Sequence, residues 1–294
     1  MNWKRAYDFL HYETFIDWCR TYLTNNPPMP VNLVSVRHGQ SELNEANQMS
    51  RDGDNSAFTE DFRNTHESQF RLTPLGRVQA QLAGAWIRRY IKFKFSRFYV
   101  SEFVRAKETA ALLDLVDASW YVDYNLRERD WGELGVMPAD ERAVKFANIL
   151  RLRQLDSFFW CPPSGESEAN LGLRINRVFG TLSRECSRDN VILVNHGEVM
   201  WSIWLNLTRM SQRRYAELSA SRHPYDHIHN CQILHFTRED PLSGKIAPYY
   251  KWMRSICPTD LSLSNNEWQP IVRPRYTNEE LAQMIEAYPT FINH

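Results

Sequence analysis

The sequence has few cysteines and no long apolar run, and these absences exclude several classes of protein. The cysteines are odd in number and widely spaced, and no two form a Cys-x-x-Cys pair: they are Cys19, Cys161, Cys186, Cys231 and Cys257. Neither a disulfide framework nor a zinc site is therefore expected. The longest apolar stretches, such as residues 191–194, are too short to cross a bilayer, and residues 1–19 lack the apolar core of a signal peptide. We expect a cytoplasmic protein.

An excess of charge of one sign is also absent. The 35 basic residues balance the 35 acidic ones, so the formal net charge is zero. Such a chain has no overall field that would draw in nucleic acid or an anionic membrane, and neither is an expected partner. Any anion that the protein binds must be held by a local cluster of arginine and histidine.

Three regions are expected along the 294 residues: a helical extension at 1–30, a main domain at 31–254 and an appendage at 255–294. Apolar residues recur at three- and four-residue steps from residue 3 to residue 23, as in an amphipathic helix. This helix either packs on the main domain, which we favour, or forms a contact in a homodimer. Residues 45–70 are polar and are expected to be an irregular insertion, a candidate lid.

Short apolar stretches alternate with helical patterns in the main domain. Strands are expected at residues 31–36, 98–101, 120–122, 191–195 and 232–236. Helices are expected at 74–90, 104–115, 140–156, 166–184 and 197–207, with a further short helix at 278–287. Alternation of this kind predicts an α/β fold, a three-layer α/β/α sandwich with a mostly parallel central sheet.

Arg37, His38 and Gly39 follow the first expected strand directly. Open α/β sheets bind ligands beyond the carboxyl ends of their strands. Arginine offers a fixed fork of donors to phosphate oxygens, and a neutral imidazole is a nucleophile. The three-residue string alone is a weak signal.

The arrangement occurs a second time, because residues 191–195 lead into His196 and Gly197. A third expected strand ends at Ser101, and Arg105 falls in the first turn of the helix after it, where the helix dipole also favours phosphate. Two imidazoles and two arginines are thus expected at one crevice.

A general acid is expected between residues 126 and 134, which contain Glu128, Asp130 and Glu133 beside Trp131. Loss of hydration near aromatic side chains raises the pKa of a carboxyl group, which suits a proton donor at neutral pH. Position alone does not choose among the three. Arg127 and Arg129 are expected at the surface or in ion pairs.

These segments, in this order, resemble the histidine phosphatase superfamily, branch 1, which contains phosphoglycerate mutase-like phosphatases. The resemblance covers roughly residues 31–237. It is carried by Arg37, His38, Gly39, Gln40, Ser41 and Asn44; by Leu72, Thr73, Gly76, Gln79 and Ala80; by Ser101, Arg105, Ala106, Thr109 and Ala110; by Leu126, Glu128 and Gly132; by Gly165, Glu166 and Ser167; and by His196 and Gly197.

The resemblance implies a role for each matched residue. His38 is the nucleophile and Glu128 the proton donor, and His196 acts with them at the reacting phosphoryl group. Arg37 and Arg105 hold the phosphoryl oxygens. Asn44 and Gly197 are further phosphate contacts. The family chemistry needs no metal and no other cofactor, so none is expected.

The expected activity is that of a phosphatase acting on a small phosphomonoester or a phosphorylated side chain. Phosphoglycerate mutases carry an Arg-Arg-(Ser/Gly)-(Phe/Tyr) string before paired prolines, and residues 151–163 contain two arginines and two prolines without that string. A mutase and a catalytically silent phospho-ligand binding module remain alternatives. His227 and His229 form a His-x-His pattern that suggests either an ordinary loop, a metal site or a substrate contact.

Overall fold

The computed structural model describes residues 27–265 and 267–292. The helix expected at residues 3–23 lies outside these residues. The main elements are β1 (Asn32–Arg37), α2 (Glu42–Arg51), α3 (Glu60–Asn64), η1 (Glu67–Gln69), α4 (Pro74–Tyr90), β2 (Arg97–Ser101), α5 (Val104–Leu112), β3 (Trp120–Asp123), α6 (Ala139–Lys145), α7 (Ala147–Leu155), α8 (Glu168–Cys186), β4 (Asn190–Asn195), α9 (Gly197–Thr208), α10 (Gln212–Ala220), β5 (Ile233–Thr237), β6 (Trp252–Ile256), β7 (Gln269–Pro270) and α11 (Asn278–Glu286).

A seven-stranded sheet forms the centre of the molecule, in the order β3-β2-β4-β1-β5-β6-β7. The first four of these strands are parallel neighbours, whereas β5, β6 and β7 pair antiparallel. Five of the seven strands therefore point the same way, and the expectation of a mostly parallel sheet is confirmed.

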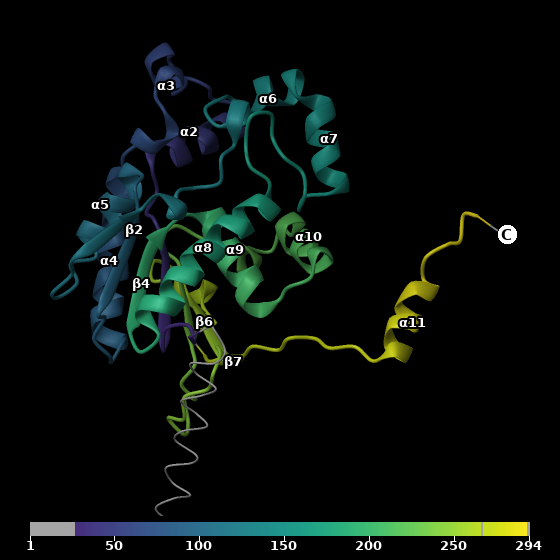
Figure 1. Ribbon diagram of the computed structural model, residues 1–294. Helices are drawn as coiled ribbons and strands as arrows, with labels where there is room; N and C mark the ends of the chain where they lie inside the picture. Colours follow the sequence, from purple (N-terminus) through teal and green to yellow (C-terminus); the bar gives the residue numbers. More distant parts are fainter. Residues whose placement is uncertain (1–26, 266, 293–294) are drawn as a thin grey trace, which may run out of the picture.

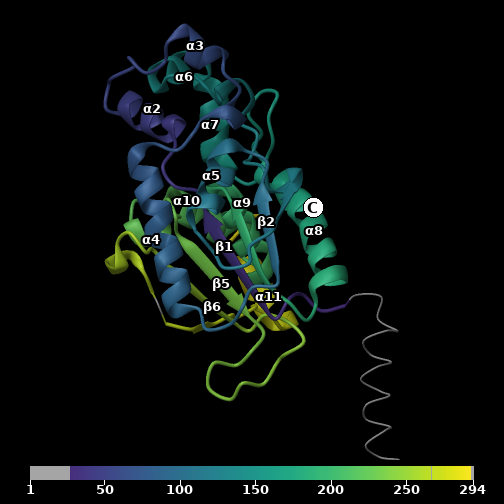
Figure 2. The same ribbon diagram turned by 90° about the vertical axis from the view of Figure 1, so that its left-hand side faces the viewer.

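Helices cover both faces of this sheet, as Figure 2 shows with α4 and α8 on opposite sides. Alternate residues of each strand point to opposite faces, so Leu33 of β1 packs with α8 and α9 while Val34 packs with α4 and α5. Both residues are completely buried. The expected three-layer α/β/α architecture is confirmed.

The helix at 74–90 begins and ends where the sequence predicts. Thr73 is its N-cap and accepts a hydrogen bond from the Gly76 amide, and Pro74 occupies the first helical turn. A proline there loses no helical hydrogen bond, because the first amides have no partner within the helix.

The expectation of an irregular insertion at 45–70 is wrong. Residues 42–51 and 60–64 are helices, and α2 begins with a capping box between Ser41 and Asn44. The polar composition concealed these helices because α2 buries only Leu43, Ala46 and Ser50, α3 buries no residue, and hydrogen bonds supply further contacts. Ser50 accepts a hydrogen bond from the Ala139 amide at 2.7 Å, and Asn55 donates to Asp140 at 3.0 Å.

The segments α2, α3, η1, α6 and α7 lie together beyond one end of the sheet, and we call them the cap (Figures 1 and 2). Arg63 of α3 forms an ion pair with Glu141 of α6 at 2.8 Å. A small apolar cluster of Leu134, Met137, Phe146 and Trp160 packs against α7 of the cap. The cap therefore has its own packing and faces the carboxyl ends of the parallel strands.

The expected boundary at residue 254 is also wrong, because it falls inside β6. This strand pairs with β5 in the main sheet and buries Met253 and Ile256 in the core. Its five residues alternate only partly between apolar and polar, so the pattern was too short to recognise. The short helix expected near 278–287 is present as α11, which lies away from the sheet in Figure 1.

Candidate active site

The register of the sheet brings the two histidines together. In the parallel pair of β1 and β4, Arg37 lies opposite Asn195, so the next residues, His38 and His196, leave the sheet side by side. The His38 amide donates to the Asn195 carbonyl at 2.9 Å, which continues the ladder by one bond. The ring centroids are 5.0 Å apart, and both residues are almost completely buried.

Hydrogen bonds fix the tautomer of His38. Its Nδ1 lies 2.6 Å from the Gly39 carbonyl, which can only accept, so Nδ1 carries the proton. Its Nε2 accepts a hydrogen bond from Arg105 Nε at 3.1 Å and therefore holds the lone pair. Burial, together with the charges of Arg105 and Arg37, lowers the pKa of His38 well below its ordinary value. The ring is neutral at physiological pH, as a nucleophile must be.

Gly39 lets α4 pack closely against the backbone that follows His38. A side-chain carbon at this position would collide with the carbonyl of Gly76 in α4. The Gly39 amide also donates to Thr109 Oγ1 at 3.0 Å. The backbone carbonyl that orients His38 is thereby held between α4 and α5.

A side chain at the carboxyl end of β2 holds His196. Its Nε2 lies 2.8 Å from Ser101 Oγ, and Ser101 Oγ in turn accepts from the Phe103 amide at 3.3 Å. The serine hydroxyl can donate to His196 Nε2 or accept from it, depending on which ring nitrogen carries the proton, and the other ring nitrogen is Nδ1. This Nδ1 is buried and has no hydrogen-bond partner among the described residues. Burial and the nearby Arg105 lower the pKa of His196 well below its ordinary value.

The two expected arginines flank His38. Arg105 is 3 % exposed and donates from Nη1 to the backbone carbonyl of Glu67 at 2.6 Å, which ties it to the cap. Arg37 donates from Nη1 to the Ile228 carbonyl at 2.5 Å, while its Nε is buried without a partner in the described chain. Gly197 lies against this guanidinium, because a carbon added there would come within 3.4 Å of Arg37 Nε.

Glu128 has the properties expected of a general acid. Burial is the main cause that raises the pKa of Glu128 to about 7, and the charge of Glu198 adds to it, while Arg105 and Arg37 act in the opposite direction. One of its oxygens accepts from the Arg129 amide at 2.9 Å. By contrast, Glu133 is exposed and lies 3.7 Å from Lys145.

One pocket of about 400 Å³ joins these residues, and we call it the His38 pocket. Its lining includes six of the seven residues expected from the sequence: Arg37, His38, Asn44, Arg105, Glu128 and Gly197. His196 lies behind it, against the His38 ring. The Asn44 side-chain oxygen accepts from the Ser41 amide and from Asn230, so its amide hydrogens are the groups that remain for an anion.

Glu67 and Glu198, which were not identified from the sequence, also line the His38 pocket. His227, one of the two histidines for which a substrate contact was an alternative, lines it as well. Burial raises the pKa of Glu67 to about 7, with Arg105 opposing and Asp130 adding to the shift. Glu198 directly follows the His196-Gly197 pair, and this position could have predicted that its side chain lies at the site. Glu67 had no comparable signal, because its place depends on how the cap folds.

Arg129 was expected at the surface or in an ion pair, and only the second is correct. It is 1 % exposed, lies 3.8 Å from Glu198 and stacks over the rings of Trp131 and Trp160. Behind Glu198 lies Glu168, whose two carboxyl oxygens are buried without partners in the part of the chain described. Burial raises the pKa of Glu168 well above its ordinary value.

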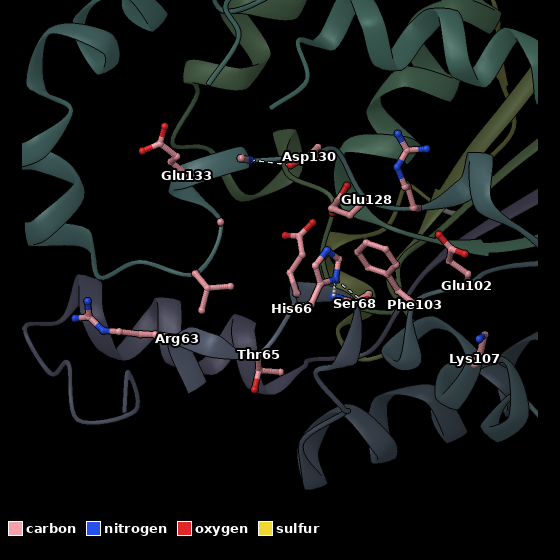
Figure 3. A pocket seen from close by; sticks show the side chains of 15 residues that line it. Arg63, Thr65, His66, Ser68, Glu102, Phe103, Lys107, Glu128, Asp130 and Glu133 are labelled. Atoms are coloured by element: carbon pink, nitrogen blue, oxygen red, sulfur yellow. Dashed lines mark hydrogen bonds between the residues drawn. The ribbon is translucent and has the colours of Figure 1, made fainter. Parts of the chain in front are cut away.

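A second pocket, of about 670 Å³, borders the first, and we call it the side pocket. Figure 3 shows the side chains of His66, Phe103 and Glu128 around its middle. The two pockets share Glu67, Glu128 and Gly135 in their linings. Glu128 is thus accessible from both sides.

Neither a metal cluster nor a membrane span is found in the residues described. No group of three or more His, Cys, Asp or Glu side chains there is arranged to hold a metal ion. His227 and His229 lie with ring centroids 6.4 Å apart, and His229 Nε2 is 2.9 Å from the Pro224 carbonyl. No helix among the same residues is both long and apolar enough for a bilayer.

Comparison with known proteins decides the family. Residues 33–240 match the histidine phosphatase superfamily, branch 1. The chain belongs to this superfamily. A 2,3-bisphosphoglycerate-dependent phosphoglycerate mutase from Sinorhizobium fredii is 31% identical over 199 residues, which are 65% of this chain and 86% of that protein. The protein of the same name from Cytophaga hutchinsonii is 29% identical over 195 residues, 65% of this chain and 83% of its own.

Solved structures of two phosphatases share the fold of this chain. A mycobacterial glucosyl-3-phosphoglycerate phosphatase superposes with a TM-score of 0.54 at 21% identity, covering 70% of this chain and 89% of that one. The α-ribazole phosphatase of Shigella flexneri gives a TM-score of 0.54 at 19% identity, with 70% and 89% covered. Proteins named as mutases are thus similar to this chain in sequence, and proteins named as phosphatases are similar to it in fold.

Proposed function

We propose that this chain hydrolyses phosphomonoesters without a metal ion, through a phosphohistidine intermediate on Nε2 of His38. The observation that supports this most strongly is the single pocket that combines a neutral, buried imidazole, two arginines and a carboxyl group with a pKa of about 7. Phosphoryl transfer needs positioning and stabilisation of charge on the phosphoryl oxygens, and these groups supply both.

In the first step, the Nε2 lone pair of His38 attacks phosphorus while the bond to the ester oxygen breaks. Arg37 and Arg105 hold the phosphoryl oxygens, so Arg105 exchanges its hydrogen bond to His38 for one to the substrate. Protonated Glu128 gives its proton to the departing oxygen. The Gly39 carbonyl, hydrogen-bonded to Nδ1, stabilises the positive charge that forms on the ring.

In the second step, water attacks phospho-His38 and Glu128, now a carboxylate, takes its proton. The phosphorus–nitrogen bond breaks, inorganic phosphate leaves, and the neutral imidazole is restored. Water can reach Glu128 from the side pocket as well as from the His38 pocket, because the residue lines both. This second route for water to Glu128 supports hydrolysis.

Three further residues have supporting roles in this proposal. His196 donates from Nδ1, the nitrogen left without a partner among the described residues, to a phosphoryl oxygen. Asn44 donates from its side-chain amide. Gly197 begins α9, whose first amides and helix dipole favour an anion at this end.

A mutase is the second candidate, and it is favoured by the names of the curated relatives at 31% and 29% identity. A mutase must protect phospho-His38 from water, whereas Glu128 here borders two pockets. The Arg-Arg string of the mutases is also absent from residues 151–163. We therefore rank hydrolysis first.

The test is turnover of p-nitrophenyl phosphate by the purified chain, with and without EDTA and vanadate. We expect activity that EDTA leaves intact, that vanadate inhibits and that His38→Ala abolishes, while His223→Ala, at an exposed loop position, serves as the matched control. Loss of activity with EDTA would overturn the metal-free mechanism. Rapid conversion of 3-phosphoglycerate in the presence of 2,3-bisphosphoglycerate would instead identify a mutase. Absence of any turnover would favour a silent binding module.

A further inference from the structure

Arg174 of α8 contacts the segment that carries Glu128, and its guanidinium is buried. From Nη1 it donates to the backbone carbonyls of Asn125 and Arg127 at 2.6 and 2.9 Å. From Nη2 it donates to the carbonyl of Glu128 itself at 3.3 Å. The other two donors, on Nε and Nη2, bind the carboxyl group of Glu166 at 3.0 and 2.6 Å. All five N–H donors of this arginine are thus in use, three of them on the backbone around the general acid.

Glu166 holds the guanidinium in place. Its two carboxyl oxygens accept one hydrogen bond each from Arg174, which is the bidentate geometry of a strong ion pair. The backbone of Glu166 is itself fixed, because its amide donates to the Asp130 carbonyl at 2.8 Å and its carbonyl accepts from Arg129 Nε at 2.7 Å. The Arg174–Glu166 pair is therefore joined to the chain both before and after Glu128.

The carboxyl group of Glu128 has few contacts that could orient it. Within the described residues it accepts one hydrogen bond, from the amide of the adjacent Arg129. It also lines two pockets, so its direction depends on the backbone that carries it. A proton donor must lie within hydrogen-bond reach of the departing oxygen, and a displacement of about 1 Å can cost about 100-fold in rate.

We propose that Arg174, held by Glu166, is the positioning residue of the general acid: it fixes the backbone of residues 125–128 so that Glu128 points at the departing ester oxygen. This inference rests on the proposed function. Neither Arg174 nor Glu166 lines the His38 pocket or the side pocket, so both act through Glu128. The role requires the planar fork of an arginine, because a lysine carries the same charge with only three donors at one point.

The test uses the leaving-group ratio, which we define as kcat/KM for p-nitrophenyl phosphate divided by kcat/KM for an alkyl phosphate. Nitrophenolate leaves without a proton, whereas an alkoxide needs one. We expect Arg174→Lys to raise this ratio about tenfold or more, chiefly through a lower kcat for the alkyl phosphate. Inhibition by vanadate should stay close to that of the wild type, because Arg37 and Arg105 are unchanged. Glu166→Gln should raise the ratio by less, and it replaces Arg174→Lys in every comparison if that variant does not fold.

Two comparisons separate positioning from a merely structural role. In Glu128→Gln there is no acid to position, so adding Arg174→Lys should change the leaving-group ratio by less than about twofold. Arg238→Lys is the matched control, since Arg238 is also buried and also donates to three backbone carbonyls, none from a residue that lines either pocket. It should lower the melting temperature and keep the ratio.

The pH profile is an independent measurement of the same role. A Glu128 that is no longer held becomes better hydrated, and hydration lowers its pKa toward the ordinary value of about 4.3. The kcat/KM for the alkyl phosphate should therefore decline at a lower pH in Arg174→Lys than in the wild type or in Arg238→Lys. An unchanged leaving-group ratio in Arg174→Lys would overturn the proposal. So would an equal rise in Arg238→Lys or in the Glu128→Gln background.

Failure of the proposed function gives a different result. If the wild type hydrolyses neither ester, the phosphatase assignment fails, but urea unfolding still reports on Glu128. Because burial raises its pKa above the unfolded value, Glu128→Gln should gain stability relative to its parent as the pH rises from about 5 to about 8. This gain should be smaller when both chains carry Arg174→Lys. An equal gain in the two backgrounds would reject the positioning role.

Discussion

Individual carboxyl groups around His38 differ in environment, and this difference determines what each can do. Glu128 lies in the pocket with a pKa of about 7, whereas Glu133, only five positions later, is exposed and near Lys145. The sequence alone did not separate these two. Loss of hydration, which depends on the folded surroundings, makes Glu128 the group that holds a proton near neutral pH.

Replacing Glu128 by Gln should slow most the hydrolysis of esters that have poor leaving groups. We expect kcat/KM for an alkyl phosphate to fall about 100-fold or more, because the departing alkoxide then receives no proton, and that for p-nitrophenyl phosphate to fall less. In the wild type, kcat/KM for the alkyl phosphate should decline above pH about 7, where Glu128 loses its proton. Glu133→Gln is the matched control. Equal slowing of both substrates would show that Glu128 is not the acid.

Glu168 should make stability depend on pH. Because burial raises its pKa well above the ordinary range, the folded protein keeps a proton that the unfolded chain has released. The free energy of unfolding therefore falls as the pH rises above the unfolded value of about 4.3. As the pH rises, the free energy of unfolding of Glu168→Gln should increase relative to that of the wild type by up to about 1.4 kcal/mol per pH unit.

Urea unfolding at about pH 5 and about pH 8 measures this effect. The control is Glu185→Gln, an exposed position on the same helix, α8, where no such trend is expected. A difference between Glu168→Gln and wild type that is the same at both pH values would contradict the prediction.

Helices that share an N-terminal capping motif differ in how much that motif contributes to the fold. Both α2 and α11 begin with a capping box, formed by Ser41 with Asn44 and by Thr277 with Glu280. Yet α2 buries Leu43, Ala46 and Ser50, while α11 has no buried residue. The same local motif therefore stabilises a packed helix in one case and an exposed helix in the other.

Ser41→Ala should lower stability by about 1 kcal/mol, because the first turn of α2 loses its side-chain acceptor. It should also raise KM, since α2 carries Asn44 and Arg51 to the His38 pocket. Thr277→Ala is the matched control and should leave the melting temperature and KM unchanged. Thermal unfolding and p-nitrophenyl phosphate kinetics measure both effects. An equal change of melting temperature and KM in the two variants would show that α2 does not depend on its N-terminal capping box.

The molecule as a whole continues past the expected end of the main domain. Residues 252–256 join the sheet as β6, and Arg273 still contacts the Leu207 and Tyr250 carbonyls at 2.7 and 3.0 Å. Among the residues that the structure describes, the segment beyond this anchor, with α11, is separate from the packed body (Figure 1).

Truncation should locate this boundary. A chain that ends at residue 276 should keep its melting temperature and its activity, because it retains β6, β7 and Arg273. A chain that ends at residue 250 should fail to fold, because it exposes the core face of β5 and removes Met253 and Ile256. A folded, active product of the shorter chain would show that β6 is dispensable.

Much of the central architecture was predictable from the sequence because it depends on local pattern. Apolar stretches rich in β-branched residues became β1 and β4, a mainly aromatic stretch became β2, and Thr73 with Pro74 marked the start of α4. Helices α6 and α7 of the cap lie where the sequence predicts a helix at 140–156. Helices α2 and α3 were missed, because polar contacts such as that of Asn47 with Arg142 contribute to the packing of the cap. A composition rich in polar residues resembles a loop until the partners of those residues are known.

The sequence by itself determined the family, the order of the strands and helices around the site and the identities of His38 and His196, because short motifs at strand ends carry that information. Tertiary structure alone decided the rest. The register of β1 against β4 set the two imidazoles 5.0 Å apart. Burial gave Glu128 and Glu67 their raised pKa values, and the folding of the cap placed Arg51 beside Arg142. Protonation and charge clustering depend on neighbours distant in sequence, which no local pattern specifies.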